Sequence, residues 1–209
     1  DGLLDLIVDN SGYPPHSKMI IFKQHSDHSF ENVAENYGID ITNPIGTVIA
    51  DFNKDGRMDI LSAQSSIRDD SITPQIRLFE NAIDVKKSRS IRVTLRGQNS
   101  NFHGLNAMII LKVETNSGLI ERRQYVSYSY GALPPQNEEG MHFVINENEK
   151  LVDFTVRWPF SKKLNVHPSE LEVKYEINID NNLFIKKKSA IDITLCESGK
   201  VVFNKKSCH

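Results

Sequence analysis

The sequence has few of the features that point to catalysis, membrane insertion or nucleic-acid binding. Its 209 residues include only two cysteines and one tryptophan, and the formal net charge is −2. Nucleic-acid binding needs a concentrated basic face, which this balance of charges does not supply. No apolar run approaches the roughly 20 residues of a membrane-spanning helix, so we expect no membrane span. No Gly-x-Ser-x-Gly, Gly-x-x-x-x-Gly-Lys or His-Glu-x-x-His motif occurs, so we expect a protein that is not an enzyme.

The stretch Asp51–Ile60 has residue types and a spacing that point to one chemistry. Oxygen-bearing side chains stand at its positions 1, 3 and 5, glycine follows at position 6, and another aspartate stands at position 9. Hard cations such as Ca²⁺ take roughly six to eight oxygen ligands, and a tightly curled loop can direct alternate side chains towards one ion. Glycine permits the sharp turn because it enters the φ > 0 region without a steric penalty. We predict a Ca²⁺ site formed by Asp51, Asn53, Asp55, Asp59 and the carbonyl of Arg57, whose side chain should point away.

Two arrangements could present such a loop. An EF-hand requires helices on both sides and a bidentate glutamate at position 12, but that position is Ser62. The flanking stretches 46–50 and 60–63 are short, apolar and partly β-branched, which favours strands. We therefore expect a strand–loop–strand calcium site, and the alternative is an acidic hairpin turn that binds no ion.

Part of the same motif stands at the start of the sequence. Asp1-Gly2-Leu3-Leu4-Asp5-Leu6 matches Asp55–Ile60 at the constrained positions, with an offset of 55 − 1 = 54 residues. A period near 50 residues with short strands is typical of β-propellers and related arrays. We expect the first site to be truncated, and we expect upstream blades or a second copy of the chain to cover the exposed sheet face.

From about residue 88 the period stops and the pattern changes to alternating apolar and polar residues. Stretches 90–96 and 150–158, and parts of 107–114 and 119–126, alternate as half-buried strands of a sandwich or barrel do. The prediction is an all-β chain in three parts. These are partial β-propeller blades over residues 1–87, a β-sandwich-like domain over 88–165 and a strand-rich C-terminal extension over 166–209.

Two further groups of residues are candidates for a covalent bond or a ligand site. Cys196 and Cys208 could close a small loop by a disulfide in an oxidising compartment, or they could be two free thiols. Several polar side chains could line a pocket for a sugar or peptide, although asparagine is also favoured where the backbone merely turns. These candidate pocket residues are Asn99, His103, Gln136 and His142.

The motif and the strands around it resemble a known repeat. Asp-x-Asn-x-Asp-Gly-x-x-Asp-Ile after a strand of small residues resembles the FG-GAP or VCBS repeat, the calcium-loop propeller blade of integrin α-chains and many bacterial surface proteins. The following region is similar to the ASPIC/UnbV domain, which commonly follows these repeats, as in proteins like cartilage acidic protein. The stretches that carry this second similarity are Ile91–Gly97, His142-Phe143 and Val156–Pro159.

These resemblances imply a function outside the cytoplasm. The chain would be a secreted, cell-surface or periplasmic module for cell adhesion or protein interaction, in which Ca²⁺ holds the shape of a blade. Its partner would be a protein or a glycan, and the protein could form homo-oligomers. The alternative is a carbohydrate- or small-ligand-binding domain, either on its own or as part of an enzyme.

Overall fold

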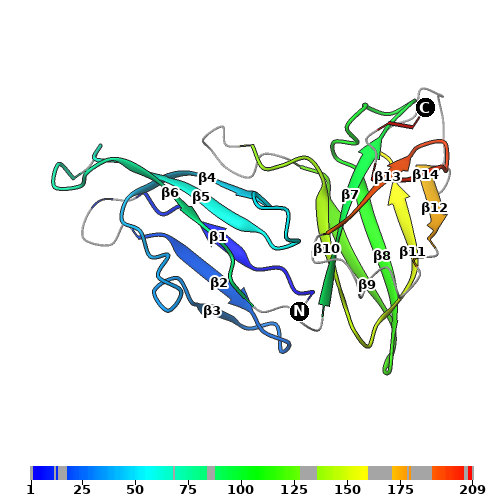
Figure 1. Cartoon of the computed structure of the whole chain (residues 1–209), viewed down its shortest axis with the longest axis horizontal. Helices are drawn as coiled ribbons and strands as arrows, with labels where there is room; N and C mark the ends of the chain where they lie inside the picture. The colour runs from blue at the N-terminus through cyan, green and yellow to red at the C-terminus, as the bar shows by residue number, and fades with distance from the viewer. Residues whose placement is uncertain are drawn as a thin grey trace.

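The computed structural model is built from β-strands (Figure 1). It describes residues 2–11, 13, 18–67, 69–83, 88–127, 136–159, 171–177, 179, 190–204 and 207–208. These residues form fourteen strands and contain no α-helix, so the predicted all-β class is confirmed. Asp1, which opens the incomplete first motif, lies outside the described residues.

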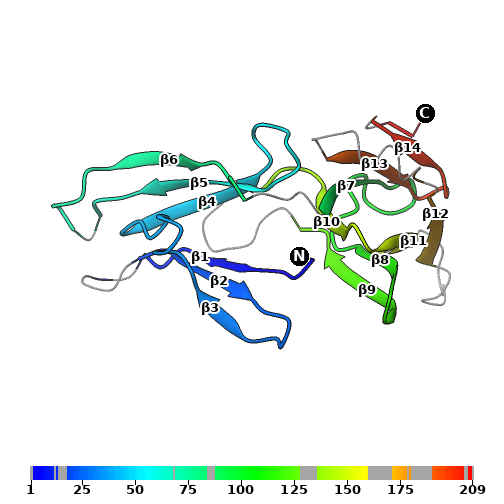
Figure 2. The same ribbon diagram turned by 60° about the horizontal axis from the view of Figure 1, so that its bottom comes forward.

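The N-terminal part of the chain forms two three-stranded antiparallel sheets, of order β1-β2-β3 and β4-β5-β6. Figure 2 shows the second sheet lying above the first. Ile60 in the second sheet packs against the buried cluster of Ile21, Val33 and Ala34, so the two sheets share an apolar layer. The strands are β1 (Leu6–Val8), β2 (Ile20–Gln24), β3 (Phe30–Asn32), β4 (Pro44–Ala50), β5 (Asp59–Gln64) and β6 (Gln75–Phe79).

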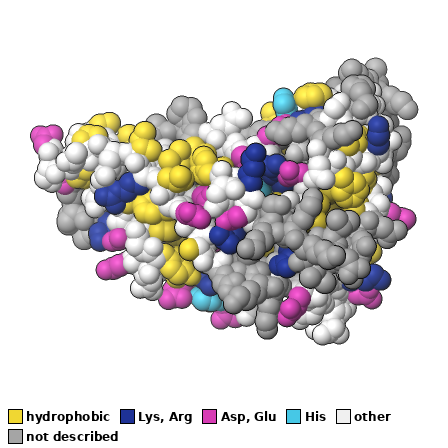
Figure 3. All heavy atoms as spheres, viewed as in Figure 1, with side chains coloured by type: hydrophobic (Ala, Val, Ile, Leu, Met, Phe, Trp, Pro, Cys, Tyr) yellow, Lys and Arg dark blue, Asp and Glu magenta, His cyan; other side chains and the backbone are white. Residues whose placement is uncertain are grey.

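The edge strand β6 leaves apolar side chains exposed. Ile76 is 74% exposed and Leu78 is 57% exposed, and they stand at alternate positions opposite Ala63 and Leu61 of β5. Because alternate residues of a strand share one face, these side chains lie together on the sheet. Figure 3 shows hydrophobic side chains gathered over the N-terminal half of the molecule, on the left of the view.

The C-terminal part forms two four-stranded sheets, of order β10-β7-β13-β14 and β12-β11-β8-β9. Both lie on the right in Figure 1. The pairing is antiparallel except between β13 and β7, which run parallel and pair from Ile191 with Ile91 onwards. The strands are β7 (Ser88–Arg96), β8 (Met108–Thr115), β9 (Gly118–Tyr125), β10 (Met141–Asn146), β11 (Lys150–Arg157), β12 (Glu172–Glu176), β13 (Ile191–Cys196) and β14 (Val201–Phe203).

The core of this part lies between its two sheets. Phe143 of β10 and Phe154 of β11 belong to opposite sheets, and their rings meet edge to face with centroids 5.6 Å apart. Trp158 at the end of β11 is buried, as is Tyr175, whose hydroxyl donates to the carbonyl of Cys196 at 2.7 Å. The alternating sequence pattern thus places one face of each of these strands in a shared apolar core.

Strands from the segment predicted as an extension complete both sheets. Strand β12 pairs with β11, and β13 inserts between β7 and β14. Cys196 at the end of β13 forms a disulfide with Cys208, with 6.0 Å between their Cα atoms.

A half-buried ion pair ties β9 to the turn between β10 and β11. The guanidinium of Arg122 binds both carboxylate oxygens of Glu149, at 2.6 and 2.8 Å, and also donates to the carbonyl of Val144. The backbone and side-chain N–H groups of Asn146 donate to the same carboxylate. Burial alone would raise the pKa of Glu149, but the hydrogen bonds from Arg122 and Asn146 outweigh it and lower this pKa to about 2.

This ion pair predicts a loss of stability in acid. Because the pKa of Glu149 is lower in the folded state, the pair contributes its full stability above about pH 4.5, the ordinary pKa of the group. The contribution disappears as the pH falls towards 2. We therefore expect the difference in unfolding free energy between wild type and Glu149→Gln, measured by urea denaturation, to shrink across this range. Glu147→Gln, at an exposed position of the same turn, should differ only slightly from the wild type in unfolding free energy, and this difference should stay constant over the same pH range.

Candidate functional site

The loop between β4 and β5 contains four residues of the predicted calcium site, Asp51, Asn53, Asp55 and Arg57, and the fifth, Asp59, is the first residue of β5. Its first residue, Asp51, is only 8% exposed and points its carboxylate into the curl of the loop. One oxygen of Asp51 accepts the N–H of Asp55 and the other that of Gly56, each at 2.9 Å. The φ angle of Gly56 is +88°, so glycine is required at this turn. Asp51 therefore holds the curl together through the backbone.

The aspartate at position 9 joins the two ends of the loop. Asp59 is buried, and its carboxylate accepts the N–H of Phe52 at 3.0 Å and that of Asn81, beyond β6, at 2.8 Å. In the incomplete first unit, Asp5 accepts the N–H of Gln24 at the end of β2, at 2.9 Å. In both units, therefore, the last aspartate of the motif accepts a backbone N–H at or just beyond the end of a strand, β6 for Asp59 and β2 for Asp5.

The middle of the loop is crossed by side-chain hydrogen bonds. The Asn53 carbonyl oxygen accepts the N–H of Asp55 at 3.0 Å. Its amide nitrogen donates to Asp55 Oδ2 at 2.9 Å and to Glu80 Oε1 at 3.0 Å. Glu80 follows β6, so the segment after the last strand of this sheet places a further oxygen beside the loop.

The prediction that the Arg57 side chain points away from the loop is wrong. The guanidinium turns back, forms an ion pair with Asp55 Oδ2 and donates from Nε to the carbonyl of Asn81 at 2.5 Å. A half-buried carboxylate attracts a nearby guanidinium, and the spacing of two residues allows Arg57 to reach it.

The loop suits a hard cation in its chemistry but only in part in its arrangement. All the candidate side chains offer oxygen atoms, and each Asp51 oxygen accepts one N–H, which leaves lone-pair capacity for an ion. Among the described residues, no three His, Cys, Asp or Glu side chains are grouped so as to hold a metal ion. Asp51, Asn53 and Asp55 would hold a cation, and Asp59, whose oxygens likewise accept one backbone N–H each, keeps the same capacity as Asp51.

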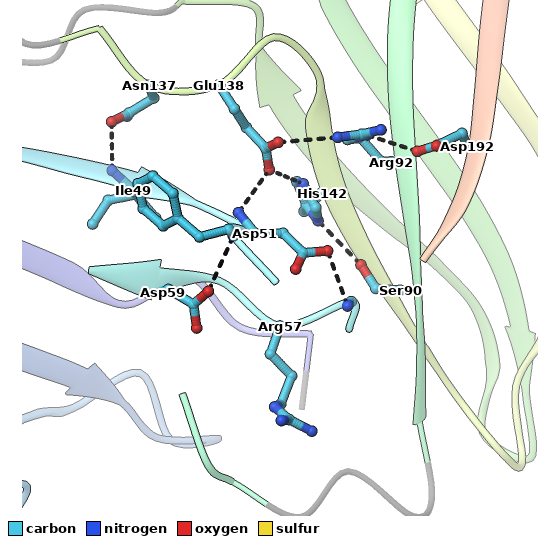
Figure 4. Close-up of polar contacts among 12 residues, drawn as sticks. Ile49, Asp51, Arg57, Asp59, Ser90, Arg92, Asn137, Glu138, His142 and Asp192 are labelled. Carbon is cyan, nitrogen blue, oxygen red and sulfur yellow. Dashed lines mark hydrogen bonds and ion pairs between the residues drawn. The ribbon is translucent and has the colours of Figure 1, made fainter. Parts of the chain in front are cut away.

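The strand that leads into the loop is joined to the C-terminal sheets. Figure 4 shows this junction. The N–H of Ile49 in β4 donates to Asn137 Oδ1 at 2.9 Å, and the N–H of Asp51 donates to Glu138 Oε1 at 3.1 Å. Asn137 and Glu138 precede β10, so the segment before β10 satisfies backbone donors of β4 and of the loop.

Glu138 is the centre of this junction. Its Oε1 lies 2.6 Å from His142 Nε2, and its Oε2 accepts from Arg92 at 3.0 Å. Arg92 in turn pairs with Asp192 at 2.6 Å, and the other ring nitrogen of His142 lies 3.2 Å from Ser90 Oγ. Burial alone would raise the pKa of Glu138, but His142, the N–H of Asp51 and Arg92 hold this pKa below its usual range.

A second contact between the two parts involves the first unit. The backbone of Gly2, with φ of +88°, passes so close to Arg122 that a Cβ atom there would lie 2.6 Å from Nε. Gly2 corresponds to Gly56 of the complete motif. Both motifs therefore lie beside the C-terminal sheets, one at Arg122 and the other at Glu138.

The four candidate pocket residues take different partners. His142 is bonded within the junction, and His103 Nδ1 lies 2.8 Å from Glu139. The backbone N–H of Asn99 donates to Glu197, which also accepts from Gln98 and Ser100, and Gln136 is exposed. Two surface hollows are lined by other residues: one by Asn10, Lys18, Met19, Ile20, Asn32, Ala34, Glu35 and Asp40, the other by Thr115–Ser117 and Asn146–Glu149.

Comparison with known families finds a match in the N-terminal part of the chain. Residues 1–62 match the family model of the FG-GAP-like repeat. The matched stretch of this repeat runs from the incomplete first motif through the loop and into β5. None of the curated proteins compared with the chain matches it. Within the described part of the chain, no helix has the length and hydropathy that a membrane span requires.

Sequence reasoning missed the residues that surround the loop. Glu80 and Asn81 follow β6, and their position just after a predicted blade strand is a signal that could have indicated them. Glu138 is followed by a second glutamate, Glu139, in a segment without periodicity, and no local pattern distinguishes it from a solvated glutamate. The role of Glu138 depends on the hydrogen bond that it accepts from the N–H of Asp51, which is 87 residues away in the sequence.

Proposed function

We propose that this chain is an extracytoplasmic module for adhesion or protein interaction, in which the 51–59 loop binds Ca²⁺ for structural purposes. The FG-GAP-like repeat over residues 1–62 suggests an extracellular interaction module and carries this proposal. Calcium near millimolar concentration, as found outside the cell, fills sites of moderate affinity. Exposed apolar side chains on β6, such as Ile76 and Leu78, support an interaction role.

The proposed role of the ion is to stiffen the loop at the junction. The carboxylate of Asp51 accepts a backbone N–H within the loop, and the N–H of Asp51 donates to Glu138. An ion bound to this carboxylate would therefore fix Asp51, a residue that joins the loop to the C-terminal part. We also propose that the C-terminal region is an ASPIC/UnbV-like domain, since β7 contains the stretch Ile91–Arg96 and β11 leads into Trp158-Pro159. The protein would bind a protein or glycan partner and would not act as an enzyme.

Calcium addition tests the proposed site directly. At a calcium concentration ten times the dissociation constant, binding to the folded state alone adds about 1.4 kcal/mol of stability. For a chain of this size, the melting temperature should rise by about 3–6 °C relative to the protein in chelator. Differential scanning calorimetry with and without calcium measures this rise.

A pair of aspartate variants links the effect to the loop. Asp55→Ala removes a predicted ligand and should abolish the calcium-dependent rise. Asp70→Ala removes an exposed aspartate outside the loop and should leave the rise unchanged. The proposal fails if saturating calcium does not raise the melting temperature of the wild type, or if Asp55→Ala responds as the wild type does.

A further inference from the structure

Arg57 binds the same carboxylate that the calcium site would use. We propose that its guanidinium is a built-in counter-ion of Asp55, which competes with a bound cation and so sets the calcium affinity of the loop. The inference rests on the calcium site proposed above and assigns to Arg57 the regulation of that site.

Arg57 engages both oxygens of the Asp55 carboxylate. Its backbone N–H donates to Asp55 Oδ1 at 2.9 Å, and its guanidinium pairs with Asp55 Oδ2. The contact is partly shielded from water, because the two side chains are only 24% and 22% exposed. The Nε atom is fixed at the same time by the carbonyl of Asn81. The guanidinium is therefore held in place from two directions.

The other loop carboxylates have no such partner. In the described part of the chain, Asp51 and Asp59 accept hydrogen bonds only from neutral backbone N–H groups. Asp55 alone among them is paired with a positive charge. To coordinate a divalent ion, Asp55 must share or release the guanidinium of Arg57. While both are bound to this carboxylate, the ion and the guanidinium repel each other at short distance.

Lys54 provides a matched control within the same loop. It carries the same charge as Arg57 and is three positions from Asp51, but its side chain is exposed. The structure shows no hydrogen bond or ion pair of the Lys54 side chain with the residues it describes. Removal of its charge changes the net charge of the loop equally, without breaking the contact with Asp55.

Isothermal titration of the full chain with calcium chloride tests the proposal. Wild type, Arg57→Gln and Lys54→Gln are compared at about 0.15 M KCl, where exposed charges are well screened. Repulsion between a unit charge and a divalent ion about 6 Å apart, even at a water-like dielectric constant, corresponds to roughly tenfold in affinity. We expect Arg57→Gln to bind calcium about tenfold more tightly than the wild type, and Lys54→Gln to stay within about threefold.

A second measurement separates competition from a purely structural role. Arg57→Gln should melt below Lys54→Gln in chelator, because Asp55 and the Asn81 carbonyl lose their partner. If Arg57 has only a structural role, its replacement lowers both the stability and the calcium affinity. If Arg57 competes with calcium, its replacement lowers the stability and raises the calcium affinity.

The outcomes distinguish this inference from the proposed function. If Arg57→Gln binds calcium no more tightly than Lys54→Gln while the wild type binds, the inference is overturned and the calcium site stands. If only Arg57→Gln binds calcium, the inference holds and the calcium-binding function of the natural chain fails. If none of the three proteins binds calcium, both are wrong.

Discussion

Replacing Glu138 by alanine is expected to lower the free energy of unfolding by about 2–4 kcal/mol. The side chains of Glu138 and Arg92 are 17% and 20% exposed, and that of His142 is 9% exposed. Removal of the carboxylate leaves Arg92 with Asp192 as its remaining partner in the network, and it leaves the Asp51 N–H without its acceptor. Urea denaturation measures the loss, and amide hydrogen exchange at Asp51 should become faster at the same time.

Two further variants show whether the loss comes from the junction. Glu138→Gln keeps the size of the side chain and one acceptor oxygen but removes the charge, so it should lose about half as much stability. Glu176→Ala removes a side chain that is 86% exposed and should stay within about 0.5 kcal/mol of the wild type. A Glu138→Ala protein as stable as Glu176→Ala would mean that Glu138 does not hold the two parts together.

The junction explains why the N-terminal sheets contact the C-terminal sheets at the loop end. Backbone donors of β4 and of the loop point towards Asn137 and Glu138, which belong to a segment anchored by β10. Gly2 of the first unit lies against Arg122 of β9. Since Asp51 and Gly2 each belong to one of the two motifs, a change in the shape of either motif reaches the C-terminal part directly.

The sequence predicted those features of the fold that depend on local patterns. The apolar stretches around residues 51–59 indicated β4 and β5, and alternation indicated β7 and β11. The φ angle of +88° at Gly56 follows from the same local argument, because the loop must turn sharply between two strands. These features are set by neighbours within a few residues, which a sequence pattern records.

Features that depend on distant pairing could not be predicted in this way. The parallel pairing of β13 with β7 brings together residues 100 positions apart, and nothing in either strand specifies that partner. The same limit applies to the candidate site. Besides its local partner Asp55, the guanidinium of Arg57 donates to the carbonyl of Asn81, which is 24 residues away and which no pattern within the loop indicates. The motif fixes the bonds within the loop, such as that of Asp51 with Gly56, while distant residues such as Asn81 supply further partners.

The aspartate at position 9 is expected to matter for folding even without calcium. Asp59→Ala removes a buried acceptor from the N–H groups of Phe52 and Asn81, and each N–H left unpaired costs about 1–3 kcal/mol where it is shielded from water. We expect the free energy of unfolding, measured by urea denaturation in chelator, to fall by about 2–4 kcal/mol. Hydrogen exchange at these two amides should become faster as the loop separates from the end of β6.

Asp59→Asn separates the acceptor role from a ligand role. Asparagine keeps one side-chain oxygen, so this variant should retain about half of the lost stability in chelator. A loss that appears for Asp59→Ala only when calcium is present would show instead that the carboxylate acts as a metal ligand. The contact between Asp5 and Gln24 in the first unit supports the acceptor role. Because the same bond recurs in both units, the last aspartate of the motif serves to join each loop to its sheet.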